Sequence, residues 1–289
     1  MLCEPTFVDA TGALIVGEAK LRSRRRQEIL SAHPRCIYCA NPHASTIEHM
    51  PPRGLFKGKQ RPSGWEFPTC SDCNEGSRGA DAIAQMLSLI PPFGGERWQF
   101  EKMKGVLPAV RKHAPRAYHE ISSNQKAKSR WVKNRGLLRD VVQVTADGPS
   151  TISHLDAFAG KMALAAFAEL IGRPMELDGT LFTQWYLNAG LSQTAYHAHL
   201  SILPNFSALQ QGKMTSAGQF WLRYNSDMKS IVAALVFFHG NLSVMAIASD
   251  GEPYKQALVD VLSAVSGPNR PGSCLMHPID LKLKTLRDI

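Results

Sequence analysis

The spacing of apolar residues along the chain predicts helices in the first two thirds and a group of strands near the end. The clearest helix is LDAFAGKMALAAFAELI at 155–171, which ends at Gly172-Arg173-Pro174, a typical stop signal. A second, GADAIAQMLSLI at 79–90, ends at Pro91-Pro92. The predicted strands are Phe220–Tyr224, Ser230–Phe238 and Leu242–Ser249, the last two joined as a hairpin.

Weaker patterns complete this picture. They predict a short basic helix at Lys20–Leu30, short strands at Ser45–His49 and Trp65–Pro68, and further helices at Thr180–Gly190 and Tyr254–Val265. Residues 97–140 read as one or two helices and a connector. The fold class is therefore α+β, with a largely helical C-terminal region that carries a β-hairpin. We divide the chain into an N-terminal basic arm (1–30), a Cys- and His-rich module (31–92) and an α+β accessory domain (93–289).

Composition places the chain among ordinary globular proteins. The 289 residues are 44% hydrophobic and 20% charged. No apolar run approaches the roughly 18–20 residues that span a bilayer, and the N-terminus lacks the basic start of a signal peptide. We expect a cytoplasmic protein with no membrane partner.

The net positive charge of the chain comes entirely from its first half. Residues 1–150 contain 23 Lys and Arg against 14 Asp and Glu, whereas residues 151–289 contain 10 of each. Such asymmetry indicates a polyanionic partner, although positive charge also serves solubility. The cluster Arg24, Arg25 and Arg26 is either a solvated helix face or an arm that contacts phosphates.

Four of the six cysteines form two C-x-x-C pairs, Cys36 with Cys39 and Cys70 with Cys73. This spacing is typical of a tetrahedral four-thiolate zinc site, which contributes folding energy and leaves no open position for substrate. A redox role for one C-x-x-C does not explain the presence of two pairs. Cys3 and Cys274 are isolated and read as incidental small residues.

The stretch CIYCANPHASTIEHMPPRGLF…GWEFPTCSDCNEGSRG resembles the zinc-containing HNH endonucleases. Members of that family show a C-x-x-C, a strand that ends in Asp-His before a proline, and a second C-x-x-C that continues into Asn. This chain has Glu48-His49 before Met50-Pro51, and Asn74 directly after Cys73. The resemblance covers about 45 residues, roughly a sixth of the chain, and implies a zinc-stabilised ββα-metal module.

The resemblance also implies a chemistry. His49 would be the general base that takes a proton from the attacking water. Glu48 and Asn74 would hold a catalytic Mg²⁺ or Mn²⁺ that stabilises charge on the scissile phosphate. Basic side chains would contact the nucleic acid: Arg24, Arg25, Arg26, Arg53, Lys57, Lys59, Arg61 and Arg78.

The chain departs from the family pattern at two points. Glu48 stands where Asp is usual, and the Asn that orients the base histidine is absent, since Trp65, Glu66 and Phe67 occupy that stretch. Structural roles also stay open: His49 as the end of a strand beside zinc, and Asn74 as a helix cap.

The sequence therefore predicts a metal-dependent endonuclease that hydrolyses phosphodiester bonds, acting on DNA rather than RNA. The C-terminal region would choose the target or form a homodimer or larger complex. The alternatives are a non-catalytic, zinc-dependent nucleic-acid-binding protein and an RNA-directed nuclease within a defence complex.

Overall fold

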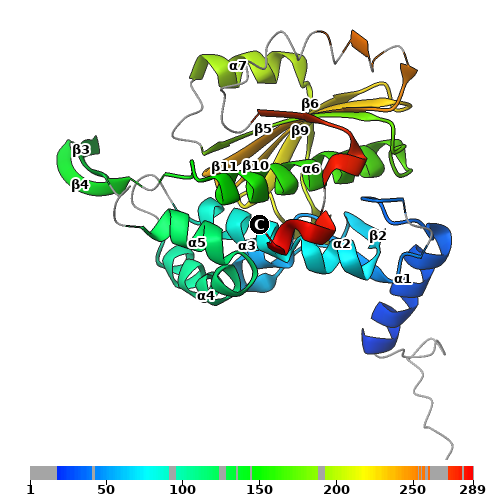
Figure 1. The fold of residues 1–289 in the computed structure, drawn as a ribbon, viewed down its shortest axis with the longest axis horizontal. Helices are drawn as coiled ribbons and strands as arrows, with labels where there is room; N and C mark the ends of the chain where they lie inside the picture. The colour runs from blue at the N-terminus through cyan, green and yellow to red at the C-terminus, as the bar shows by residue number, and fades with distance from the viewer. Residues whose placement is uncertain are drawn as a thin grey trace, which may run out of the picture.

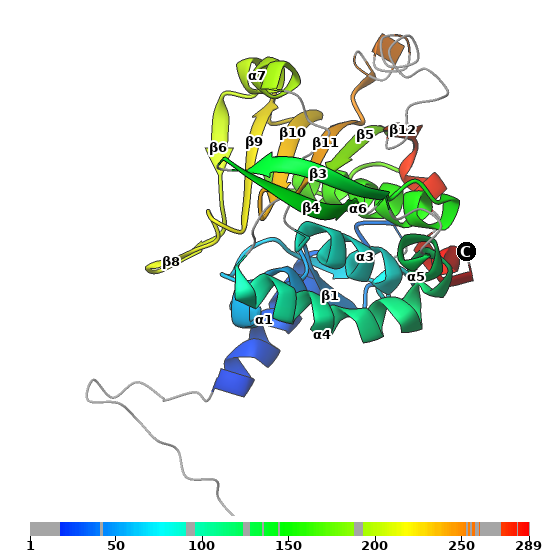
Figure 2. The same ribbon diagram turned by 90° about the vertical axis from the view of Figure 1, so that its left-hand side faces the viewer.

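The computed structural model describes residues 18–40, 43–90, 96–123, 128–134, 136–143, 145–187, 193–252, 254, 256–257, 260, 273–281 and 283–288. Its elements form layers (Figure 1): helix α7 lies on one face of a six-stranded sheet, and helix α6 lies on the other face. The Cys-rich segment and its helices pack beneath α6 (Figure 2).

The Cys-rich segment is built around a short hairpin. Strands β1 (Thr46–His49) and β2 (Glu66–Thr69) are antiparallel, with Glu48 opposite Phe67 and His49 opposite Glu66. Helix α2 follows β2 directly, so that a hairpin and a helix adjoin. The other elements of this part are α1 (Glu18–Ala32), η1 (Arg53–Leu55), η2 (Lys57–Lys59), α2 (Ser71–Gly76) and α3 (Arg78–Ser88).

A helical stretch connects this segment to the sheet. It contains α4 (Arg97–His113), α5 (Pro115–Ser122), β3 (Lys128–Asn134), β4 (Leu137–Gln143) and α6 (Pro149–Ile171). The β3–β4 hairpin extends away from the other elements (Figure 1). Helix α6 ends at Gly172, whose φ of 82° is a left-handed conformation that glycine adopts without a Cβ clash.

The main sheet is antiparallel at every pairing, with strand order β12-β5-β11-β10-β9-β6. Its strands are β5 (Thr180–Leu187), β6 (Asn205–Ser207), β9 (Phe220–Ser226), β10 (Ile231–Phe238), β11 (Leu242–Ser249) and β12 (Ser273–Met276). The remaining elements are α7 (Gln193–Ile202), β7 (Gln210–Gln211), β8 (Met214–Thr215), η4 (Pro278–Leu281) and η5 (Leu283–Asp288).

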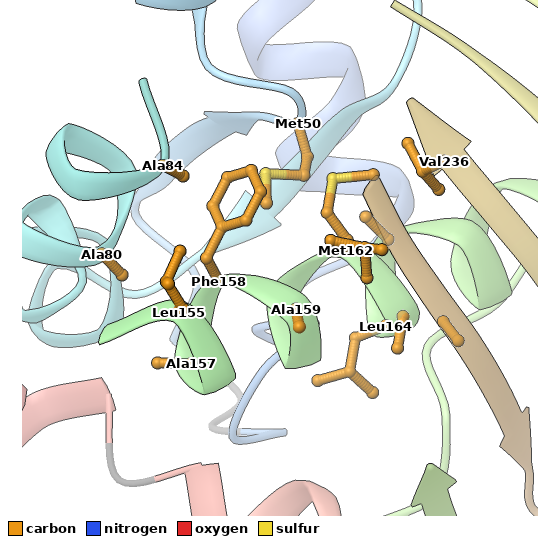
Figure 3. Close-up of a cluster of buried hydrophobic side chains, with 14 of the residues drawn as sticks. Met50, Ala80, Ala84, Leu155, Ala157, Phe158, Ala159, Met162, Leu164 and Val236 are labelled. Carbon is orange, nitrogen blue, oxygen red and sulfur yellow. The ribbon is translucent and has the colours of Figure 1, made fainter. Parts of the chain in front are cut away.

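Helix α6 is the centre of the core, because it is buried on both sides. It packs against α3 and α5 on one side and against β5, β10 and β11 on the other. Figure 3 shows Met50, Ala80 and Ala84 of the Cys-rich segment close to Phe158 on one side of α6, with Val236 of β10 on the other side. One cluster of buried side chains consequently runs from Cys36 to Leu286.

The structure confirms the mixed α+β class, the predicted helices at 20–30, 79–90 and 155–171, and the β10–β11 hairpin. The helix predicted at Thr180–Gly190 is wrong, because these residues form β5, which pairs with β11 and β12. The C-terminal region is also less helical than predicted, since the hairpin belongs to a six-stranded sheet. The helix predicted at Tyr254–Val265 lies largely outside the described residues. Among the described helices, none is both long and apolar enough to cross a membrane.

Candidate metal centre and histidine site

The two C-x-x-C pairs meet at one point of the fold. Cys36 and Cys39 precede β1, whereas Cys70 caps α2 and Cys73 lies in its first turn. The Cys70 sulfur accepts a hydrogen bond from the backbone N–H of Cys73 at 3.5 Å. The β1–β2 pairing thus brings together two pairs that are 31 residues apart.

The sulfur geometry fits a tetrahedral ion. All four Sγ atoms lie within 4.8 Å of one another, and the Sγ atoms of Cys39 and Cys70 are 3.7 Å apart. A zinc ion with Zn–S bonds of about 2.3 Å places its sulfurs about 3.8 Å apart. Three of the four cysteines are buried and Cys39 is half-buried, so the donor set forms a closed site. These four cysteines could hold a metal ion such as zinc.

The C-terminal end of the chain packs against this centre. A Cβ on Gly76 of α2 would lie 2.1 Å from the backbone oxygen of Leu283, so only glycine allows η5 to approach α2 this closely. Nearby, Lys284 Nζ lies 3.9 Å from a carboxylate oxygen of Asp72. Residues 283 and 284 therefore pack against α2, the helix that carries Cys73.

His49 ends β1 on the solvent-facing side of the hairpin. Its side chain is 23% exposed, and its Nε2 accepts a hydrogen bond from the Arg53 guanidinium at 2.6 Å. The opposite residue on β2, Glu66, has a carboxylate oxygen 3.7 Å from the same Nε2. The other Glu66 oxygen lies 2.9 Å from the guanidinium of Arg25 on α1.

These four side chains, Arg25, His49, Arg53 and Glu66, form one polar group that we call the His49 face. Burial and then the Arg53 charge lower the pKa of His49 to about 4, and the Glu66 carboxylate opposes this shift only partly. The imidazole is therefore neutral at pH 7. Because Arg53 can only donate to Nε2, the ring proton is assigned to Nδ1.

Glu48 lies on the other face of the hairpin. Successive side chains of a strand point in opposite directions, and β1 pairs with β2 through His49, so Glu48 and His49 diverge. The Glu48 carboxylate is 5% exposed and lies 3.3 Å from Nζ of Lys161 on α6. Burial raises the pKa of Glu48 to about 7, although Lys161 opposes the shift. Lys161 also binds both oxygens of Asp81, at 2.7 and 2.9 Å.

Asn74 links helix α2 to the hairpin. Its amide nitrogen donates to the hydroxyl of Thr46 at 3.1 Å, which ties α2 to β1. The structure therefore separates Glu48 from His49, although Glu48, His49 and Asn74 all sit on the elements expected from the sequence.

The predicted nucleic-acid contacts divide into three groups. Arg25 and Arg53 belong to the His49 face. Arg61 is a structural link: its guanidinium donates to the backbone oxygens of Met50, Pro51, Pro62 and Trp65, and burial lowers its pKa to about 10. The other five side chains are exposed. On α1, Arg24 pairs with Glu28 and Arg26 donates to the Ser45 backbone oxygen. Lys57 lies over the Trp98 ring with Lys59 two residues further along the chain, and Arg78 lies near Glu75.

A cleft of about 250 Å³ opens beside the His49 face. Glu66 forms part of its wall, together with His33, Glu169 and Arg173, and the end of α6 closes it. The cleft thus places further polar and charged groups next to the hairpin.

Three contributors to this region were missed from the sequence: Glu66, Asp81 and Lys161. The signal for Lys161 was present, because it is the one charged residue in the apolar run AFAGKMALAAFA. Glu66 had no signal, since its role depends on cross-strand register. Comparison with known proteins finds no matching family model, curated protein or solved structure.

Proposed function

We propose that the protein is a nuclease that binds nucleic acid at the His49 face and hydrolyses phosphodiester bonds with His49 as the general base. One observation carries this proposal: a neutral, partly exposed histidine at the end of a hairpin strand accepts a hydrogen bond from Arg53 and lies beside Glu66, which pairs with Arg25, and four clustered thiolates lie in the same segment. A site for phosphodiester hydrolysis needs a base and fixed positive charge, and this face offers both.

In this proposal the arginines bind substrate and the histidine accepts a proton. Arg25 and Arg53 bind the phosphate and balance the negative charge that grows during attack. When Arg53 turns to the phosphate, it releases His49 Nε2, whose lone pair then accepts a proton from the attacking water. The water oxygen bonds to phosphorus as the P–O bond to the leaving oxygen breaks, and solvent water supplies the proton that the leaving oxygen takes up. The loss of the Arg53 contact raises the pKa of His49, so the base becomes stronger when substrate is bound.

Zinc fits the four cysteines and has a structural role in this proposal. A catalytic Mg²⁺ or Mn²⁺ held by Glu48 and Asn74 does not fit the geometry. The Glu48 carboxylate is already paired with the Lys161 ammonium, and it lies on the face of the hairpin opposite to His49. We therefore derive no step through a metal ion at these residues.

The test is a cleavage assay on supercoiled plasmid and on single-stranded DNA and RNA, each with Mg²⁺, with Mn²⁺ and with EDTA. We expect wild-type protein to cut at least one substrate and His49→Ala to cut at least 100-fold more slowly, since general-base catalysis contributes about 10²–10⁴-fold. His197→Ala is the matched control, because His197 is an exposed histidine on α7. Equal zinc content in all three proteins excludes a folding defect, and equal cleavage by His49→Ala would refute the role of His49.

A second function, zinc-dependent nucleic-acid binding without cleavage, is favoured by the position of Glu48. Its carboxylate is committed to Lys161, and Glu66 is the carboxylate within 4 Å of His49 Nε2. Binding alone requires only the basic side chains. Salt-dependent binding of all substrates, without cleavage under any metal condition, would establish this alternative.

A further inference from the structure

Lys161 is a charged residue in the middle of helix α6, most of whose residues are buried. It has 0% exposure, and its neighbours in α6 are apolar, among them Phe158, Met162 and Ala165. An ammonium group at such a position is costly unless it is paired and hydrogen-bonded. The Lys161 ammonium therefore requires oxygen partners close by.

The Lys161 ammonium lies inside a cage of oxygen atoms. Asp81 contributes two carboxylate oxygens at 2.7 and 2.9 Å, Ser77 a hydroxyl at 3.0 Å, and Glu48 a carboxylate oxygen at 3.3 Å. The Tyr38 ring closes one side, with its centroid 5.7 Å from Nζ. These oxygens come from β1, the start of α3 and the junction between α2 and α3, so α6 inserts its single cation between the elements of the Cys-rich segment.

Two carboxylates and a hydroxyl are ligands that a hard divalent cation also prefers. The Glu48 carboxylate is buried, the Asp81 carboxylate is largely buried, and both lie against the same nitrogen. A free divalent ion cannot share this space, because the ammonium repels it and occupies the point on which the oxygens converge.

We propose that Lys161 replaces a divalent metal ion as the cation that neutralises Glu48 and Asp81. On the Glu48 face of the hairpin the cation is then the Lys161 ammonium, which is covalently part of the chain. Zinc at the four cysteines is then the metal ion that the Cys-rich segment needs in order to fold. Lys161 is a positioning residue: it holds β1, whose last residue is His49, against α3 and α6. This inference rests on the buried contacts and does not depend on the proposed nuclease activity.

The experiment measures Mn²⁺ binding without nucleic acid, by electron paramagnetic resonance, on zinc-loaded full-length protein. We expect Lys161→Ala, which leaves two carboxylates beside an empty volume, to bind about one Mn²⁺ per chain at least tenfold more tightly than wild type does. The double variant Lys161→Ala with Glu48→Gln should lose that gain. A folded Lys161→Ala that gains no Mn²⁺ binding would overturn the proposal.

A second arm uses only proteins that keep Lys161, so it decides the question even if Lys161→Ala does not fold. Wild-type protein and Glu48→Gln should show the same Mn²⁺ binding, because the ammonium already occupies the site. If wild type binds Mn²⁺ and Glu48→Gln does not, a metal ion reaches Glu48 despite Lys161 and the proposal fails. Because no substrate is present, either result is independent of whether the protein cleaves nucleic acid.

Discussion

Replacing Lys161 by Met tests how much the buried ion cluster contributes to stability. Methionine keeps the length of the side chain but removes its charge, so the buried Glu48 and the largely buried Asp81 are left without a cation. Removal of one partner of a buried ion pair costs about 3–5 kcal/mol. This loss is a large part of the free energy of unfolding of a typical protein, which is about 5–15 kcal/mol. At about 2–4 °C for each kcal/mol in a chain of this size, the unfolding midpoint should fall by roughly 6–20 °C.

The loss should also depend on pH. Without the ammonium, both carboxylates can avoid a buried charge only by taking up protons, so their pKa values rise in the folded state. A carboxyl group whose folded pKa is raised stabilises the protein less as pH rises through that pKa. The difference between Lys161→Met and wild type should therefore be larger at pH 8 than at pH 5.

The assay is urea unfolding followed by tryptophan fluorescence at both pH values, with zinc present throughout. Lys213→Met is the matched control, because Lys213 is exposed, and it should unfold within about 0.5 kcal/mol of wild type. The triple variant Lys161→Met, Glu48→Gln and Asp81→Asn removes all three charges and should regain most of the loss. If Lys161→Met unfolds within about 1 kcal/mol of wild type at pH 8, the cluster does not stabilise the fold as argued here.

Four further predictions concern the candidate zinc centre and the two faces of the hairpin. Metal analysis should find one zinc per chain, and Cys39→Ser should lower both zinc content and thermal stability, whereas full zinc retention would contradict the four-thiolate site. The Glu48→Gln variant removes the titration of Glu48 and leaves that of His49, whose pKa is lowered to about 4 in the folded protein. As pH falls, His49 takes up a proton in the unfolded chain before it does so in the folded one, so this variant should lose stability between about pH 6.5 and 4. The His49→Gln variant removes the titration of His49 and leaves that of Glu48, whose pKa is raised to about 7, so its stability should instead fall as pH rises from about 4.5 to 7. Equal slopes of unfolding free energy against pH in the two variants would refute both pKa assignments. Arg53→Gln should raise the pKa of His49, measured by NMR titration of its ring protons, and an unchanged titration would show that Arg53 does not act on the imidazole.

Several features could be predicted from the sequence because their physics is local. Four cysteines in two C-x-x-C pairs are typical of a four-thiolate cluster, since each pair forms a turn that offers two sulfur atoms. The period of apolar residues predicted the α6 helix, and Gly172 marked its end. The strands β9 to β11 followed from short apolar runs bounded by turn residues.

The error at β5 has a physical reason. TLFTQWYL is buried along most of its length because it pairs with strands on both sides and is covered by α6, so it lacks the alternation of a half-exposed strand. A short apolar run of this kind does not distinguish a buried strand from a helix. Residues Thr180–Leu187 form a strand because they pair with β11 and β12.

Glu48, His49 and Asn74 were identified from residues that lie close together in the sequence, yet their surroundings were decided over long distances. Pairing of β1 with β2 through His49 sends the histidine toward Arg53 and Glu66 and sends Glu48 to the opposite face. Lys161, which meets Glu48 there, is 113 positions away in the sequence and on another helix. The sequence alone determined that thiolates, a histidine and carboxylates are present in one segment. Only the tertiary structure decided which of them share a face, because strand register and helix packing, and not sequence order, determine which charges are buried together.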